Sequence, residues 1–212
     1  RGRSQPVPPG SGSGILFAWL AIALIAADLL SFDLTLFRFP SLAEVSAPGH
    51  EAAEWLAAQP SPFRTYSPSY SLPQPAAAQA GLQQIDGVEP VHLTRYDRFM
   101  AVAGGYDQEA FSVTLPPFHG GLRKEPADLA LPDLRLFGPL NGRYVVSAFP
   151  LEMAGLVLRW QGAGALVYEN TLALPRAFVV HHTEPISGTM DEEMARLERI
   201  DLEGTALVAG GR

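Results

Sequence analysis

The sequence predicts a mixed-sheet α/β (α+β) domain preceded by one transmembrane helix, and three observations carry this prediction. An apolar stretch with one ionisable residue lies near the N-terminus, at residues 14–32. Segments typical of helices and of strands are interleaved over residues 33–212, which indicates a mixed α/β architecture. Hydrophobic residues make up 47% of the chain and charged residues 17%, a balance typical of a globular chain with a packed core.

The apolar stretch reads GILFAWLAIALIAADLLSF. At about 1.5 Å per residue, a helix of this length spans roughly 28 Å, close to the ~30 Å hydrocarbon core of a bilayer. Residues 1–13 hold two arginines and no acid, so the positive-inside rule predicts a flexible cytoplasmic linker there and an extracytoplasmic domain at residues 33–212. Asp28 and Asp33 then lie at the outer interface of the cell membrane, where a carboxylate reaches water.

Two alternatives compete with a retained spanning helix. Residues 15–27 are apolar and end in Ala-Ala, a pattern typical of a secretory signal peptide whose cleavage would release a secreted domain. The apolar character resumes after Asp28, which favours a retained helix instead. A buried core helix of a soluble protein is the other alternative, and the missing polar stripe argues against it.

The first half of the domain contains few strand signals. Residues 48–58 have the pattern of a short amphipathic helix, which Pro60 ends, and aromatic and β-branched residues predict a strand at 63–67. A Pro/Ala/Gln/Ser loop follows at 67–80. Further along we expect a short strand before an Asp86-Gly87 turn, a helix at 90–101 closed by Gly104-Gly105, a strand at 110–115, a loop at 116–126 and a helix at 131–140.

The C-terminal third is richest in strand signals. Gly162-Ala163-Gly164 predicts a hairpin turn between two of these strands. We expect strands at 143–148, 155–161, 165–169, 177–182 and 205–209, with a helix at 191–200.

Composition and motifs exclude several kinds of chemistry. The formal charge of −7 gives no support to nucleic-acid binding, and the absence of cysteine rules out disulfides and thiolate catalysis. His181 and His182 are neighbours on an expected strand and point to opposite faces, so we expect no metal site there. His119 precedes two glycines, as in a hydrolase oxyanion loop, but the chain contains no Gly-x-Ser-x-Gly motif. We therefore expect no cofactor and assign no catalytic residue.

Several blocks resemble bacterial YfhO-type membrane proteins of the GT-C-like glycosyltransferase superfamily. The main block is YEN at 168–170 followed by LPRAFVV at 174–180. Blocks at 63–66 (FRTY), 85–87 (IDG), 95–96 (RY) and 140–147 occur in the order found in that family. The resemblance extends over most of the chain, from about residue 24 onward.

The resemblance implies a polytopic envelope protein that transfers sugar from a polyprenyl-phosphate donor to an envelope glycan or lipid acceptor. The catalytic acids of such transferases lie in an early external loop, so this chain is expected to lack the catalytic centre. More extracytoplasmic sequence and a closing helix are implied after Arg212, which makes the domain incomplete at its C-terminus. The competing hypothesis is a single-pass, membrane-anchored binding or scaffolding module without enzymatic activity.

Six polar residues are the candidates for contact with a lipid-linked phosphate or a sugar. Arginine donates in a bidentate manner to phosphate, which directs attention to two arginines of the resembling blocks. The alternative is an architectural role, in which these side chains hold a turn between core strands and an arginine pairs with a carboxylate. The six candidates are Arg95, Arg176, Asp86, Tyr96, Glu169 and Asn170.

Overall fold

The computed structural model describes residues 12–36, 49–107, 111–117, 130–162 and 164–209. Contacts between Cα atoms divide the chain into two compact units, Arg1–Ala43 and Glu44–Arg212.

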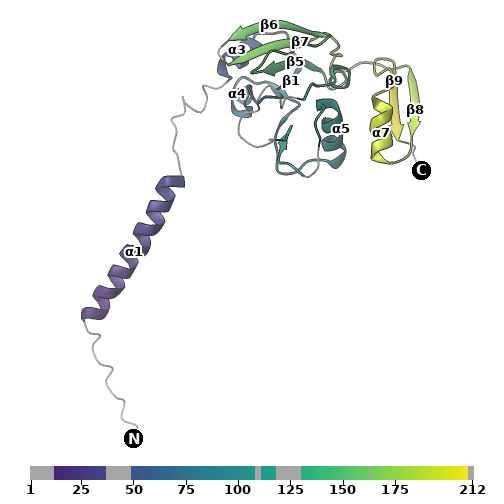
Figure 1. The fold of residues 1–212 in the computed structure, drawn as a ribbon. Coiled ribbons are helices and arrows are strands. Elements are labelled where there is room, and N and C mark those ends of the chain that lie inside the picture. Colours follow the sequence, from purple (N-terminus) through teal and green to yellow (C-terminus); the bar gives the residue numbers. More distant parts are fainter. Residues whose placement is uncertain (1–11, 37–48, 108–110, 118–129, 163, 210–212) are drawn as a thin grey trace. The chain divides into compact units, whose positions relative to one another are not determined.

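The N-terminal unit contains the helix α1 (Gly12–Leu36), which Figure 1 shows as one continuous helix. It extends slightly beyond the predicted span at both ends. The stretch Gly14–Ser31 is long and apolar enough to cross a membrane, and none of it is buried against protein. A stretch with these properties serves either as a membrane anchor or as a signal sequence.

The second unit contains a five-stranded mixed sheet in the order β2-β1-β5-β7-β6. Strand β1 (Arg64–Tyr66) pairs in parallel with β2 (Gln83–Gln84) and with β5 (Gly142–Ser147). Strand β7 (Ala165–Asn170) runs antiparallel to β5 and to β6 (Leu156–Gly162). The predicted mixed α/β class and the hairpin between β6 and β7 are thereby confirmed.

Helices pack on both faces of this sheet, which explains why β5 is buried along nearly its whole length. Tyr144 and Val146 of β5 belong to a cluster with residues of α3 (His50–Ala57) and α4 (Gln74–Gln79). Val145 points to the opposite cluster, which includes residues of α5 (Thr94–Gly104) and α6 (Leu134–Phe137). Successive side chains of a strand alternate between faces, so a strand covered on both faces buries nearly all of them.

Aromatic contacts fix α3 on the sheet. Trp55 of α3 stacks on Trp160 of β6, with 6.5 Å between the ring centroids, and meets Tyr144 edge to face at 5.9 Å. Such pairs stabilise a fold by about 0.5–1.5 kcal/mol beyond the area they bury. The buried residues Ala52, Ala53 and Leu56 form the rest of the contact face.

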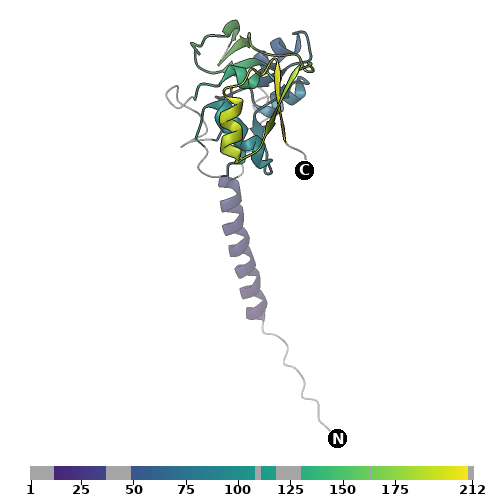
Figure 2. The same cartoon turned by 90° about the vertical axis from the view of Figure 1, so that its right-hand side faces the viewer.

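A separate strand–helix–strand segment follows β7. Strands β8 (His182–Ile186) and β9 (Thr205–Ala209) pair in parallel, and α7 (Met190–Leu197) connects them and lies beside them (Figures 1 and 2). A capping box of Thr189 and Glu192 starts α7. Two ion pairs join α7 to α5, and the guanidinium of Arg135 donates to the carbonyl oxygens of Glu198 and Ile200.

Two predicted elements were wrong. The strand expected at 177–182 begins only at His182, because β8 takes its register from β9, and residues 177–179 are exposed and pair with none of the described strands. The expected loop at 67–80 contains α4, whose Ala76 and Ala77 are buried in the cluster with α3. Packing therefore stabilises a short helix that local sequence does not mark.

Other boundaries differ in a way that shapes the site. Helix α5 begins at Thr94 rather than at residue 90, since Leu93 is extended, and it ends at the left-handed Gly105. Gly87 belongs to a two-residue strand, β3 (Gly87–Val88), which pairs antiparallel with β4 (Thr114–Leu115). The predicted helix at 131–140 is confirmed only over α6, where the side chain of Asp133 accepts a hydrogen bond from the Arg135 N–H.

Candidate functional site

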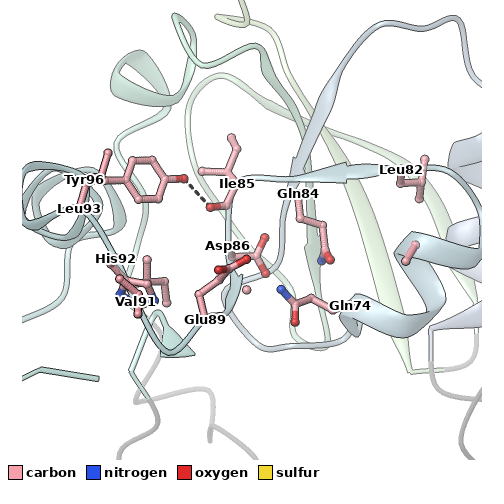
Figure 3. A pocket seen from close by; sticks show the side chains of 13 residues that line it. Gln74, Leu82, Gln84, Ile85, Asp86, Glu89, Val91, His92, Leu93 and Tyr96 are labelled. Atoms are coloured by element: carbon pink, nitrogen blue, oxygen red, sulfur yellow. Dashed lines mark hydrogen bonds between the residues drawn. The ribbon is translucent and has the colours of Figure 1, made fainter. Parts of the chain in front are cut away.

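A cavity of about 510 Å³ lies beside the segment that connects β2, β3 and α5 (Figure 3). Its size falls in the range of small-molecule sites, roughly 300–1,000 Å³. Helix α4 contributes one part of the lining, the β2–β3 segment contributes the middle, and the extended residues before α5 contribute the other part. The lining residues are Gln74, Ala78, Leu82, Gln84, Ile85, Asp86, Gly87, Glu89, Val91, His92, Leu93, Tyr96 and Leu115.

Asp86 is the buried acid of this cavity. Asp86 is 7% exposed, and its Oδ1 accepts a hydrogen bond from the Ser67 N–H at 3.1 Å. Burial raises the pKa of the Asp86 carboxyl to about 7, although hydrogen bonds from its own backbone and from Ser67 lower it. Among the described residues that line the cavity there is no lysine or arginine. No lysine or arginine of the lining therefore balances the negative charge of Asp86.

Three tyrosines experience the charge of Asp86. The Tyr96 hydroxyl donates to the carbonyl oxygen of Ile85 at 2.6 Å, as Figure 3 shows. Burial, followed by the charge of Asp86, raises the pKa of Tyr96 to about 12. Burial and the same charge also raise the pKa of Tyr66 and of Tyr70 above the ordinary value. These phenols consequently remain protonated hydrogen-bond donors at neutral pH.

His92 and Glu89 also line the cavity, and the sequence analysis did not single them out. His92 Nδ1 lies 2.9 Å from Asp97 Oδ1, and the imidazole is 4% exposed. Since a carboxylate accepts, Nδ1 is the donor of this hydrogen bond. Within the described part of the chain this buried Nε2 has no hydrogen-bond partner. The spacing of His92 and Asp97 is the only sequence signal for this pair, and it is weak.

A second depression, of about 490 Å³, lies beside the end of β7. Arg143 Nε donates to Glu169 Oε1 at 3.0 Å, and Arg159 Nε donates to Glu169 Oε2 at 2.7 Å. Burial by itself raises the pKa of Glu169, but the hydrogen bonds and charges of the two arginines outweigh it and hold that pKa below its ordinary value. Both oxygens of the Glu169 carboxylate are therefore already paired with guanidinium groups.

The side chain of Asn170 has an architectural role. Its Nδ2 donates to the carbonyl oxygens of Leu134 and Gly142, at 3.1 and 3.0 Å, and its Oδ1 accepts from the Leu172 N–H at 2.9 Å. The residue is 2% exposed. A buried amide that bonds three backbone groups positions the segment after β7 rather than offering atoms to a ligand.

The two candidate arginines lie in different surroundings. Arg95, on α5, forms an ion pair with Glu193 of α7 at 3.1 Å. Arg176 is exposed in the segment between β7 and β8. Neither of them lines the two cavities. The structure thus places Asp86 and Tyr96 in one cavity, Glu169 and Asn170 in the other, and the two arginines in neither.

The remaining candidates offer little chemistry to a cofactor or metal. Asp28 is exposed on α1, and Asp33 belongs to the same helix. His119 lies outside the described residues. Among the residues that the structure describes, no group of three or more His, Cys, Asp or Glu side chains is arranged to hold a metal ion. The cavity beside Asp86, with its two carboxylates, is the best candidate for a ligand site.

In the comparisons with known proteins, no protein-family model, no curated protein and no solved structure matches this chain.

Proposed function

We propose that this chain is an extracytoplasmic binding domain, with its anchoring helix, of a polytopic membrane protein resembling YfhO. The observation that carries the proposal is α1, whose apolar stretch Gly14–Ser31 has no protein packed against it. Burying about twenty apolar side chains in lipid removes a large exposed apolar surface, which a soluble chain would not tolerate.

The packing of the YEN block supports the resemblance. The Tyr168 hydroxyl accepts a hydrogen bond from the Leu151 N–H at 3.0 Å, Glu169 joins two arginines, and Asn170 bonds three backbone groups. All three side chains of the block therefore hold β7 in place. A block that specifies packing is a reasonable marker of a shared fold.

The proposed reaction of the intact protein is sugar transfer from a polyprenyl-phosphate donor to an envelope glycan or lipid acceptor. The resemblance places the catalytic acids of such transferases in an early external loop, and no three-ligand metal group is present within the described residues. The chemistry is therefore assigned to another part of the intact protein, and this domain contributes binding. Arg176, exposed and outside both cavities, is the arginine best placed to meet a lipid phosphate, since Arg95 is engaged by Glu193.

A second candidate function is a single-pass binding or scaffolding module. It is favoured by the same helix, because one apolar helix long enough to span a bilayer is found among the described residues. The reading frame around this segment separates the two candidates. Eight or more apolar spans upstream, with acids in the first external loop, support the transferase. A frame that starts near Arg1 and stops near Arg212 contradicts it.

Membrane topology is directly testable because the chain has no cysteine. Two single-cysteine variants, Ser4→Cys before α1 and Gln79→Cys on an exposed end of α4, are expressed in bacterial cells and treated with a membrane-impermeant maleimide. We expect Gln79→Cys to be labelled in intact cells and Ser4→Cys only after lysis. Labelling of Ser4→Cys alone in intact cells would contradict the proposed orientation.

The same pair of variants tests signal cleavage. A mature protein that has lost Ser4→Cys and starts near Asp28 would show that residues 15–27 form a signal peptide and that the domain is secreted. Retention of the N-terminus, with resistance of the protein to extraction by alkaline carbonate, is the result expected for a membrane anchor.

A further inference from the structure

We propose that the cavity beside Asp86 binds a small organic ammonium ion, with the cationic nitrogen against the carboxylates of Asp86 and Glu89. The carbon part of the ligand would lie on the apolar side chains Val91 and Leu93 at the rim. This proposal concerns the α/β unit alone and does not depend on the proposed membrane function.

Charge is the first argument. Asp86 is buried, and the described lining supplies a second carboxylate, Glu89, but no lysine or arginine; its one histidine, His92, faces Asp97 through Nδ1. Figure 3 shows these two carboxylates at the centre of the lining, between the side chains before α5 and the amide of Gln74. A buried carboxylate without a cation is costly, whereas a buried charge pair with hydrogen bonds is tolerated. A cationic ligand supplies the missing partner.

The hydrogen-bonding inventory is the second argument. The carboxylates of Asp86 and Glu89 are acceptors, and His92 Nε2 is a buried nitrogen with no hydrogen-bond partner among the described residues. The Tyr96 hydroxyl already donates to the carbonyl oxygen of Ile85. An alkylammonium group has three donors and no acceptor, so it matches this surplus of acceptors. A phosphate or carboxylate ligand would instead meet two like charges.

Exposed apolar side chains are the third argument. Val91 is 80% exposed and Leu93 is 79% exposed, although both line the cavity. Val88, next to the lining residues Gly87 and Glu89, is 50% exposed. Apolar groups around a polar floor favour an amphipathic ligand, one with a carbon chain beside its charged end.

The test titrates the full chain in neutral maltoside micelles with n-butylammonium chloride and, as the uncharged control of the same length, with 1-butanol. The readout is the backbone amide resonances of Ser67, which donates to Asp86, and of Gly87. These amides report on the cavity, so a probe that only partitions into the micelle is not counted as bound. We expect saturable shifts of both amides with n-butylammonium and none with 1-butanol.

Three variants assign the charge. Asp86→Asn and Glu89→Gln should each weaken n-butylammonium binding, Asp86→Asn by about tenfold or more. Glu152→Gln removes an exposed acid between β5 and β6 and changes net charge equally, so it should leave the affinity unchanged. If Asp86→Asn folds poorly, as judged by tryptophan fluorescence, Glu89→Gln still decides, because Glu89 is exposed and its substitution leaves the core intact.

The pH dependence adds a specific signature. Burial raises the pKa of Asp86 to about 7, while an alkylammonium stays charged to about pH 10. The ionised fraction of Asp86 therefore rises about tenfold between pH 6 and pH 8, and the affinity should rise by the same factor. Other titratable or charged groups near Asp86 are Tyr66, Tyr70, Tyr96, Glu89, His92 and, beyond Tyr96, Arg64. Asp86→Asn should remove the dependence, which separates Asp86 from His92.

Several results would overturn the proposal. Equal shifts with 1-butanol would show an apolar site, and saturation by glucose without saturation by n-butylammonium would show a polyol site. Saturation by CaCl₂ or MgCl₂ alone, with n-butylammonium inactive, would show a metal site. Unchanged n-butylammonium affinity in both Asp86→Asn and Glu89→Gln would also refute it.

Discussion

Two carboxylates of the α/β unit, Asp86 and Glu169, lie in opposite electrostatic surroundings. Asp86 is buried beside a cavity whose described lining contains no lysine or arginine, and its pKa is raised to about 7. Glu169 lies between the guanidinium groups of Arg143 and Arg159, and its pKa is lowered. Both residues lie in blocks that resemble the same family, so the sequence gives no reason to expect different roles for them.

The difference between the two carboxylates separates binding from architecture. Asp86 is desolvated and has no arginine or lysine beside it in the described lining, so it can still bind a cation. The charge of Glu169, on β7, is already paired with Arg143 of β5 and Arg159 of β6. A strongly perturbed group in a cavity is a better candidate for ligand contact than a carboxylate paired with two arginines near the end of β7. The following predictions test this division.

The largest expected effect is at Asn170, on the architectural side. Asn170→Ala removes the three hydrogen bonds that this buried amide forms with backbone groups of Leu134, Gly142 and Leu172. At up to about 1.5 kcal/mol for each lost hydrogen bond, we expect a loss of about 4 kcal/mol in the free energy of unfolding. Denaturant unfolding followed by tryptophan fluorescence measures it. Thr171→Ala, which removes one exposed hydrogen bond, is the control and should cost below about 1 kcal/mol.

The next effect is the pH dependence that Asp86 imparts to stability. Its pKa is raised in the folded state from 3.8 to about 7, so the stability it contributes is fully present below pH 3.8 and is lost as the pH rises through 7. Asp86→Asn lacks this loss and can still accept from the Ser67 N–H. Between pH 5 and pH 8, the free energy of unfolding of the variant should therefore rise by about 3 kcal/mol relative to that of the unsubstituted protein. Parallel pH profiles for the two proteins would show that Asp86 is solvated.

Glu169→Gln should have a smaller effect with the opposite pH dependence. The pKa of Glu169 is lowered, so its contribution is present above the unfolded value of 4.5 and is lost as the pH falls through the folded value. Its arginine partners are partly exposed, which limits the expected loss at pH 7 to about 1 kcal/mol. Unfolding curves at pH 7 and pH 3 should show a gap that closes at the lower pH. A gap that persists at pH 3 would assign the effect to packing.

The smallest effect is expected at Arg176. This side chain is exposed, so Arg176→Gln should change the free energy of unfolding by less than about 0.5 kcal/mol. Arg159→Gln, which removes an ion pair with Glu169, is the matched substitution and should cost more. If the two variants proved equally destabilising, Arg176 would be architectural and its proposed contact with a lipid phosphate would lose its basis.

Local sequence patterns were sufficient for the elements that are locally determined. The apolar run of α1, the strands β5, β6, β7 and β9, and the glycine that ends α5 follow from hydrophobicity, β-branching and turn chemistry. Helix α4 and the start of β8 were missed, because α4 depends on packing against α3 and β8 depends on its register with β9.

The candidate site was predictable only in part. Asp86 and Tyr96 stood out in the sequence, and they line one cavity. Glu89 and His92 did not stand out, because they line the cavity only when the segment before α5 is extended rather than helical. The sequence also could not predict that Arg95 is ion-paired while Arg176 is exposed, because Glu193, the partner of Arg95, lies 98 residues further along the chain.

The sequence by itself determined the apolar helix, the class of the fold and the strands of its sheet, since these depend on composition and periodicity over a few neighbouring residues. Only the tertiary structure decided that Asp86 is buried next to a cavity while Glu169 is held by two arginines. Burial and charge pairing are sums over groups distant in sequence: Ser67 and Asp86 are 19 residues apart, and Arg143 and Glu169 are 26 apart. The free energy of a charged side chain depends on those neighbours rather than on its own type.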